Sequence, residues 1–122
     1  MNKTILIVDD SASVRQVLSS ALLGAGYQVI AAGDGEDALA MLDGRRLNLV
    51  ICDVNMPRLD GLGFVRQMKA HPDYKFTPVI MLTTESARDM KEQGRDAGAR
   101  AWVVKPFPLK QMMDAVSRLV LP

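Results

Sequence analysis

The sequence predicts an α/β protein in which a parallel sheet carries helices on both of its faces. Five short apolar runs alternate along the chain with stretches of helical spacing. Because parallel strands need crossover connections, which are right-handed, this alternation favours a parallel sheet. The length of 122 residues fits one domain, and a 48% apolar composition can form a core without disulfides or a structural metal.

The five apolar runs are the expected strands. Four of them are rich in the aliphatic residues of fully buried strands, namely residues 5–8, 49–52, 79–82 and 102–104. The remaining run, residues 27–31, is weaker and more polar. We therefore expect four buried strands and one less apolar strand, which is the second along the chain.

The stretches between the runs have apolar residues at steps of three and four, which places these residues on one face of a helix. The first stripe consists of Val14, Val17, Leu18, Ala21 and Leu22. The last helix begins near Pro108, and Leu109 is the first of its inward positions. Residues 86–97 offer few apolar positions among many charges, so we expect this helix to be the least firmly anchored.

Charge and cysteine content narrow the classes of function. Fifteen basic and fourteen acidic residues give a net charge of +1 without long runs of either sign, which disfavours nucleic acid as a partner. Cys52 has no partner for a disulfide and is expected to be a core thiol of an intracellular protein. No apolar stretch is long enough for a signal peptide or a membrane span. We expect a cytoplasmic protein that binds neither nucleic acid nor membrane.

Polar residues follow four of the strands at their carboxyl ends, where open parallel sheets bind ligands. Asp9 and Asp10 follow the first strand, and Asp53, Thr83 and Lys105 follow the third, fourth and fifth. Carboxylates about 5 Å apart repel by about 3 kcal/mol per pair at an effective dielectric of about 20, so cations must sit among them. Lys105 supplies one positive charge, and Mg²⁺ suits the carboxylate oxygens.

Asp53 is the expected nucleophile of this site. A carboxylate with an ordinary pKa of about 3.9 is ionised at neutral pH and can attack phosphorus to form an aspartyl phosphate. Phosphoryl transfer then needs little beyond positioning and neutralisation of the phosphoryl oxygens. Mg²⁺, Lys105 and the hydroxyl of Thr83 are the groups that would neutralise them.

Four motifs follow one another in the chain. They are Val8-Asp9-Asp10, Asp53-Val54-Asn55-Met56-Pro57 with Asp60-Gly61, Leu82-Thr83, and Val104-Lys105-Pro106. In this order and spacing they resemble the response-regulator receiver family, and most closely its single-domain chemotaxis regulators. The resemblance covers the whole chain. It implies one receiver domain over residues 1–122 with a flavodoxin-like (βα)5 fold and strand order 2-1-3-4-5.

The resemblance implies a role for each polar residue at the carboxyl edge. Asp53 would accept a phosphoryl group from a CheA-like histidine kinase. Asp53, Asp10 and the main-chain carbonyl of Asn55 would hold Mg²⁺ directly, with Asp9 acting through water. Lys105 and Thr83 would contact the phosphoryl oxygens, and the Lys105-Pro106 peptide bond would be cis.

The resemblance also assigns residues that set the lifetime of the phosphoryl group and a residue that moves on phosphorylation. Asn55 and Glu85 are both polar and able to orient water, which predicts loss of the phosphoryl group within seconds to a few minutes. Trp102 stands where receivers have an aromatic residue that turns inward as Thr83 moves. A static, half-buried Trp102 is the alternative, since Trp is larger than the usual occupant.

The output surface is expected on the helix of residues 86–97, the strand at Trp102 and the final helix, a face that such receivers typically use. The chain ends directly after the final helix. We therefore expect a partner protein, and not an attached domain, to carry the output.

Three other interpretations stay open. Asp9, Asp10 and Ser11 could serve only as helix caps. A small Mg²⁺-dependent phosphohydrolase would also use Asp53 as nucleophile, but it needs an acid where the chain has Asn55. A flavodoxin-like nucleotide-binding module needs a phosphate-binding loop after the first strand, where two aspartates would repel phosphate. We therefore expect a phosphoacceptor switch and not an enzyme, apart from self-phosphorylation by small donors and autodephosphorylation.

Overall fold

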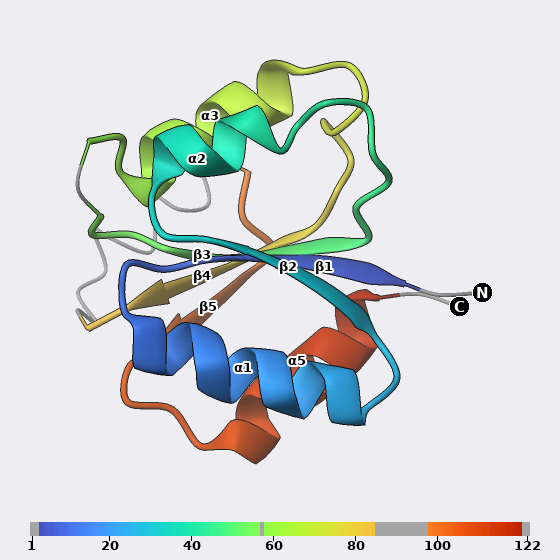
Figure 1. Ribbon diagram of the computed structural model, residues 1–122, viewed down its shortest axis with the longest axis vertical. Coiled ribbons are helices and arrows are strands. Elements are labelled where there is room, and N and C mark those ends of the chain that lie inside the picture. Colours follow the sequence, from blue (N-terminus) through green and yellow to red (C-terminus); the bar gives the residue numbers. More distant parts are fainter. Residues whose placement is uncertain (1–2, 57, 85–97, 121–122) are drawn as a thin grey trace.

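Five parallel strands form one sheet through the centre of the molecule (Figure 1). The computed structural model describes residues 3–56, 58–84 and 98–120. The strands are β1 (Thr4–Val8), β2 (Gln28–Ala32), β3 (Leu49–Asp53), β4 (Val79–Thr83) and β5 (Ala101–Val104). Their order is β2-β1-β3-β4-β5, and every neighbouring pair is parallel. The predicted fold class and strand order are confirmed.

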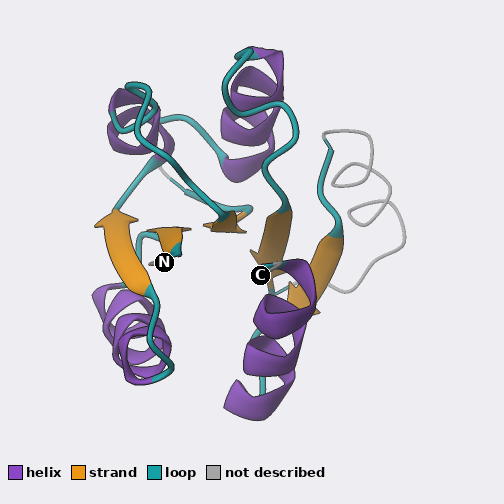
Figure 2. Ribbon diagram, turned by 90° about the vertical axis from the view of Figure 1, so that its right-hand side faces the viewer, coloured by secondary structure: helices purple, strands orange, loops and turns teal. Residues whose placement is uncertain are grey.

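Within the described residues, four helices cover the two faces of the sheet. The helices α1 (Ala12–Gly24) and α5 (Leu109–Leu119) lie on one face, and α2 (Gly35–Ala40) and α3 (Gly61–Ala70) lie on the other (Figures 1 and 2). The helix predicted for residues 86–97 lies outside the described residues. None of the described helices is long and apolar enough to cross a membrane.

Alternate residues of each central strand enter two separate cores, because successive side chains of a strand point to opposite faces. The core beneath α2 and α3 includes Leu6, Val50, Cys52, Met81, Phe64 and Val65. The core beneath α1 and α5 includes Ile5, Ile51, Ile80, Leu18, Leu22, Met112 and Val116. Burial on both faces explains the continuous apolar runs of the central strands, and the partly exposed edge strand β2 explains the weaker run.

Two residues assigned to inward stripes lie on the surface. Val17 is 53% exposed and Leu109 is 41% exposed, so their predicted inward packing is wrong. Val17 lies about 100° around the helix from the buried Leu18, at the margin of the apolar stripe. Leu109 is the first residue of α5. Both residues line a groove beside the carboxyl edge of the sheet.

Candidate functional site

The predicted site residues converge because four parallel strands end at the same edge of the sheet. The register pairs Val8 with Cys52 and Asp53 with Leu82, so the residues at these strand ends are neighbours in space. Asp9, Asp53 and Thr83 are buried at this edge. Asp10 and Asn55 are exposed, and Glu85 lies outside the described residues. The placement predicted for the polar residues of the described strand ends is therefore observed.

Three carboxylates form the acidic part of the site. Asp9, Asp10 and Asp53 each offer one oxygen, and these oxygens lie within 4.8 Å of one another. Two of the three residues are buried, where like charges repel more strongly than in water. Oxygen ligands around an open position are the surroundings that Mg²⁺ prefers, since it keeps water and phosphate oxygens in its shell.

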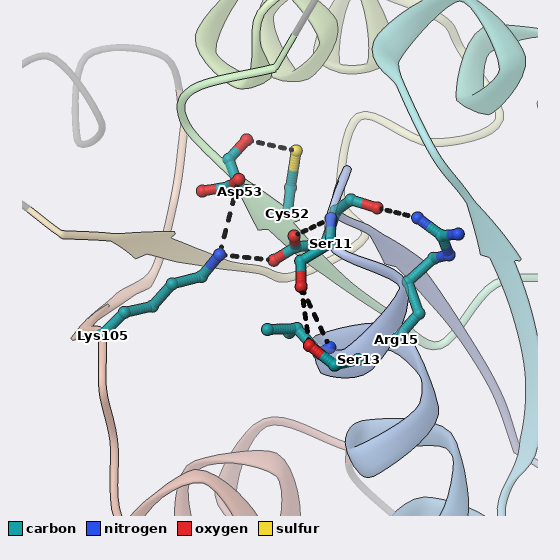
Figure 3. Close-up of polar contacts among 8 residues, drawn as sticks. Ser11, Ser13, Arg15, Cys52, Asp53 and Lys105 are labelled. Carbon is teal, nitrogen blue, oxygen red and sulfur yellow. Dashed lines mark hydrogen bonds and ion pairs between the residues drawn. The ribbon is translucent and has the colours of Figure 1, made fainter.

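Lys105 is the cation that faces this cluster. Its Nζ lies 2.7 Å from Oδ2 of Asp9 and 3.5 Å from Oδ2 of Asp53 (Figure 3). Burial lowers the pKa of Lys105, but its contacts with Asp9 and then Asp53 outweigh this effect and raise the pKa above its usual value. The single positive charge of Lys105 cannot neutralise the negative charges of three carboxylates. The donor set therefore fits a divalent cation.

Asp53 is the carboxylate whose proton affinity the site changes most clearly. Burial and then the charge of Asp9 raise the pKa of Asp53 from 3.8 to about 6, against the opposing effect of Lys105. Asp53 is thus mainly ionised at neutral pH even without a metal ion. A bound divalent cation would favour the ionised, nucleophilic form further.

The turn after β1 holds Asp9 through both its side chain and its main chain. Oδ1 of Asp9 accepts a hydrogen bond from the amide of Ser11 at 2.9 Å. Nη1 of Arg15 donates to the main-chain oxygen of Asp9 at 2.7 Å (Figure 3). Ser11 is the N-cap of α1 and accepts from the amide of Val14 at 3.3 Å. The capping interpretation is therefore right for Ser11, whereas the carboxylates of Asp9 and Asp10 take part in the acidic cluster.

The contact between Arg15 and the main-chain oxygen of Asp9 was not predicted from the sequence. Arg15 lies in the second turn of α1 and reaches back to the end of β1. Its sequence neighbourhood does not distinguish it from an ordinary solvent-exposed arginine of an amphipathic helix. The only available signal is its position one turn after the capping Ser11.

The close packing of α3 against β3 explains why glycine follows Asp60 at the start of α3. A Cβ atom at Gly61 would lie 1.9 Å from the main-chain oxygen of Asp53. The amide of Gly61 donates to the main-chain oxygen of Val54 at 2.9 Å. Glycine therefore lets the first turn of α3 lie directly against the end of β3, close to the loop that carries Asn55.

Cys52 and the cis peptide bond agree with their predictions. Cys52 is a free, buried thiol, and burial raises its pKa well above the usual value, so the neutral thiol is the stable form. The Lys105-Pro106 peptide bond is cis. The amide of Lys105 donates to the main-chain oxygen of Thr83 at 2.6 Å, which joins the end of β4 to the loop after β5.

Trp102 lies on β5 and is partly buried. It packs against the core beneath α2 and α3, and it also lines a hollow of about 480 Å³ beside α5. Its indole Nε1 is buried, and no described residue accepts a hydrogen bond from it. This position is compatible with either predicted behaviour of the ring.

A family model for the response regulator receiver domain matches residues 5–117. The chain belongs to this family. It is therefore a receiver domain of two-component signalling, a family of phosphoacceptor switches, and its acidic triad is typical of a Mg²⁺ site.

Known proteins resemble the chain over nearly its whole length. Chemotaxis protein CheY4 of Vibrio cholerae has a similar structure, with a TM-score of 0.93 and 42% sequence identity over 98% of this chain and 99% of that chain. The receiver domain of sensor histidine kinase PA1611 from Pseudomonas aeruginosa PAO1 is 26% identical with a TM-score of 0.89, covers 98% of each chain, and has a magnesium ion in its active site cleft.

Some relatives are longer than this chain. The probable transcriptional regulator ycf27 of Porphyridium aerugineum is 41% identical over 96% of this chain, but the match covers 47% of ycf27. The chain spans about half the length of the first curated relatives that it matches.

Proposed function

We propose that the protein is a phosphorylation-activated switch in which Asp53 accepts a phosphoryl group from a histidine kinase. The observation that carries this proposal is the position of the Asp53 carboxylate. It lies within 4.8 Å of oxygens of Asp9 and Asp10, and its Oδ2 is 3.5 Å from Nζ of Lys105. A carboxylate between a cation site and an ammonium group is suited to attack phosphorus.

The residues that would hold Mg²⁺ are Asp10, Asp53 and the main-chain carbonyl of Asn55, with Asp9 acting through water. The excess of carboxylates over ammonium groups at this edge supports this assignment. When bound, the ion supplies positive charge next to the phosphoryl oxygens. The chain's own residues carry the remaining steps.

Phosphoryl transfer starts with the ionised carboxylate of Asp53. One of its oxygens attacks the phosphorus, and the phosphorus–nitrogen bond of the donor phosphohistidine breaks. The leaving imidazole nitrogen keeps the electron pair of that bond and takes up a proton. Lys105 neutralises charge on the phosphoryl oxygens, and the hydroxyl of Thr83 donates a hydrogen bond to one of them.

We place this switch in chemotaxis and in the cytoplasm. The resemblance to CheY4 over nearly the full length of both chains supports a chemotaxis role. The second candidate is the receiver part of a longer regulator, which the match to about half of ycf27 favours. Partner proteins that co-purify with the phosphorylated form from source cells distinguish the two.

For the output partner we propose the surface formed by β5 and α5. Residues of both elements line a hollow of about 480 Å³, and among them are Trp102, Lys110, Asp114 and Arg118. Because Trp102 belongs both to this surface and to a core, a change of its side chain would alter the surface directly. The residues 86–97, also assigned to this face, lie outside the described part of the chain.

For the histidine kinase we propose the apolar groove between α1 and the loop after β5. The groove has a volume of about 420 Å³, and Lys105 lines it as well as facing Asp53. Val17 and Leu109 expose apolar surface there. A donor histidine that reaches Asp53 must place the body of its own protein on surface adjoining the site, and this groove adjoins it.

The test is phosphotransfer from the purified, radiolabelled kinase to the wild type and to two variants. Asp53→Asn should accept no label from the kinase or from acetyl phosphate. Val17→Glu should lose at least about tenfold in transfer from the kinase because it puts a charge into an apolar contact, yet keep labelling by acetyl phosphate. Gln16→Glu, at an exposed neighbouring position of α1, is the matched control and should transfer normally.

Label on Asp53→Asn at the wild-type level would contradict the proposed acceptor. Normal transfer to Val17→Glu would contradict the proposed docking groove without affecting the acceptor assignment.

A further inference from the structure

A second polar hollow lies at the amino edge of the sheet, opposite the Asp53 site. It has a volume of about 420 Å³, and most of its lining comes from segments that precede strands. Its lining includes Lys3, Arg46, Asn48, Phe76, Pro78 and Arg100. In Figure 1 the start of β1 and the end of α5 lie at this edge. We call this feature the amino-edge hollow.

Positive charge dominates the amino-edge hollow. Lys3, Arg46 and Arg100 line it against a single carboxylate, that of Asp73. Among residues 3–56, 58–84 and 98–120, none of these three cations forms an ion pair. Three cations that line the same hollow with one carboxylate favour an anion that carries several negative charges.

A fourth cation lies next to the hollow. Lys69 donates from Nζ to the main-chain oxygen of Thr77, which is itself part of the lining. Burial and then the charge of Arg100 lower the pKa of Lys69. The hollow thus adjoins two cations that repel each other, and a bound anion would relieve this repulsion.

The backbone around the hollow is fixed by the sheet. The amide of Asn48 donates to Thr4 at 2.8 Å, and the side chain of Asn48 accepts from the amide of Thr4 at 2.9 Å. The amide of Arg100 donates to Val79 at 2.9 Å. Arg100 therefore extends from an anchored position, and the backbone within two residues of Lys3 and Arg46 is also fixed, which lowers the entropic cost of binding a ligand.

The shape and chemistry favour a phosphate-bearing ligand over an acidic peptide. Small-molecule sites commonly have volumes of about 300–1,000 Å³, and arginine forks match phosphate bidentately. Phe76 is 78% exposed at the rim, and Nζ of Lys75 lies 5.0 Å from its ring centroid. Peptide carboxylates are spread along a chain, whereas a polyphosphate concentrates its charge within a space of the size of this hollow.

We propose that the amino-edge hollow binds a small phosphate-bearing anion, such as an inorganic polyphosphate or a nucleoside diphosphate. The site is separate from Asp53 and lies at the other end of the strands. Its occupation requires neither Mg²⁺ nor phosphorylation, so this inference stands independently of the proposed function.

The test is an NMR titration of the ¹⁵N-labelled full chain with pyrophosphate and, separately, with ADP in Mg²⁺-free buffer. We expect saturable shifts of the amides of residues 46–48, 76–77 and 100, without comparable shifts at Asp10 and Asp53. Charge reversal by Arg46→Glu with Arg100→Glu should weaken binding at least about tenfold. Arg66→Glu, an exposed reversal on α3, should leave binding unchanged.

Two further experiments distinguish a nucleotide from an inorganic polyphosphate and test whether the variants are folded. Tighter binding of ADP than pyrophosphate, with the difference lost in Phe76→Ser, supports a nucleotide, and equal affinities support an inorganic polyphosphate. The milder pair Arg46→Gln with Arg100→Gln repeats the test, and unchanged ¹⁵N amide signals away from the hollow report an intact fold in these variants.

Three results would overturn the proposal. The first is no saturable shift at these amides up to about 10 mM ligand. The second is unchanged affinity in the folded double variants. The third is tighter binding of a glutamate-rich peptide than of pyrophosphate at the same amides, which assigns the hollow to an acidic protein segment.

Discussion

Burial of the Asp53 carboxylate destabilises the Mg²⁺-free fold. Its pKa is raised from 3.8 to about 6, so the folded state binds more protons than the unfolded state between these values. The contribution of Asp53 to stability therefore falls as the pH rises through this window, and it stays unfavourable at neutral pH. The acidic site that we propose for phosphoryl transfer thus lowers the free energy of unfolding until a cation binds.

Replacement of this charge should stabilise the Mg²⁺-free protein. We expect Asp53→Asn to raise the free energy of unfolding at pH 7.5 by about 1–2 kcal/mol, below the full linkage value because part of the group keeps solvent contact. The gain should shrink toward pH 4, where Asp53 becomes protonated. Urea unfolding across this pH range measures the difference, and added Mg²⁺ should stabilise the wild type more than the variant. If Asp53→Asn were no more stable than the wild type at pH 7.5, the ionised Asp53 carboxylate would not destabilise the fold as we expect.

At the scale of elements, the joint between β3 and α3 determines the geometry of the acceptor. The first turn of α3 approaches so closely that a Cβ at Gly61 would meet the main-chain oxygen of Asp53 at 1.9 Å. A side chain there must displace the end of β3, the start of α3, or both.

Gly61→Ala should therefore lower the free energy of unfolding by more than about 3 kcal/mol, and it should reduce labelling of Asp53. The matched control is Gly24→Ala, since a Cβ at Gly24 has nothing within 4 Å. Chemical denaturation of both variants checks this prediction. If Gly61→Ala lowered the free energy of unfolding no more than Gly24→Ala does, the joint between β3 and α3 would tolerate a side chain.

The strand β5 lies between the proposed acceptor site and the proposed output surface. Trp102 is the only tryptophan of the chain, so intrinsic fluorescence reports this strand alone. We expect beryllofluoride with Mg²⁺ to change its emission, Thr83→Ala to remove most of that change, and Mg²⁺ alone to have little effect. An unchanged spectrum, with beryllofluoride binding confirmed by NMR, would leave Trp102 as a static packing residue.

At the scale of the whole molecule, the net charge of +1 conceals a separation of charge between the two ends of the sheet. Asp9, Asp10 and Asp53 gather at the carboxyl edge, whereas Lys3, Arg46 and Arg100 gather at the amino edge. Anions therefore have two possible sites. At the acidic edge they would bind to a cation held by the carboxylates, and at the basic edge they would bind directly to the Lys and Arg side chains.

The fold and the acidic site were predictable from sequence because each depends on a local signal. Buried strands produce continuous apolar runs, and strand ends place Asp53 and Lys105 at one edge without further information. The exposure of Val17 was not predictable, since its position at the margin of a stripe depends on how α1 sits on the sheet. The contact of Arg15 and the amino-edge hollow depend on segments distant in sequence, and no motif marks them.

The most direct test of the central claim is mass spectrometry after incubation with acetyl phosphate. We expect one phosphoryl group on the peptide that contains Asp53, formed in the presence of Mg²⁺ and absent both without Mg²⁺ and in Asp53→Asn. Asp114→Asn, an exposed acid of α5, is the control and should be labelled like the wild type. Labelling of Asp53→Asn at the wild-type level, or equal labelling without Mg²⁺, would contradict the account.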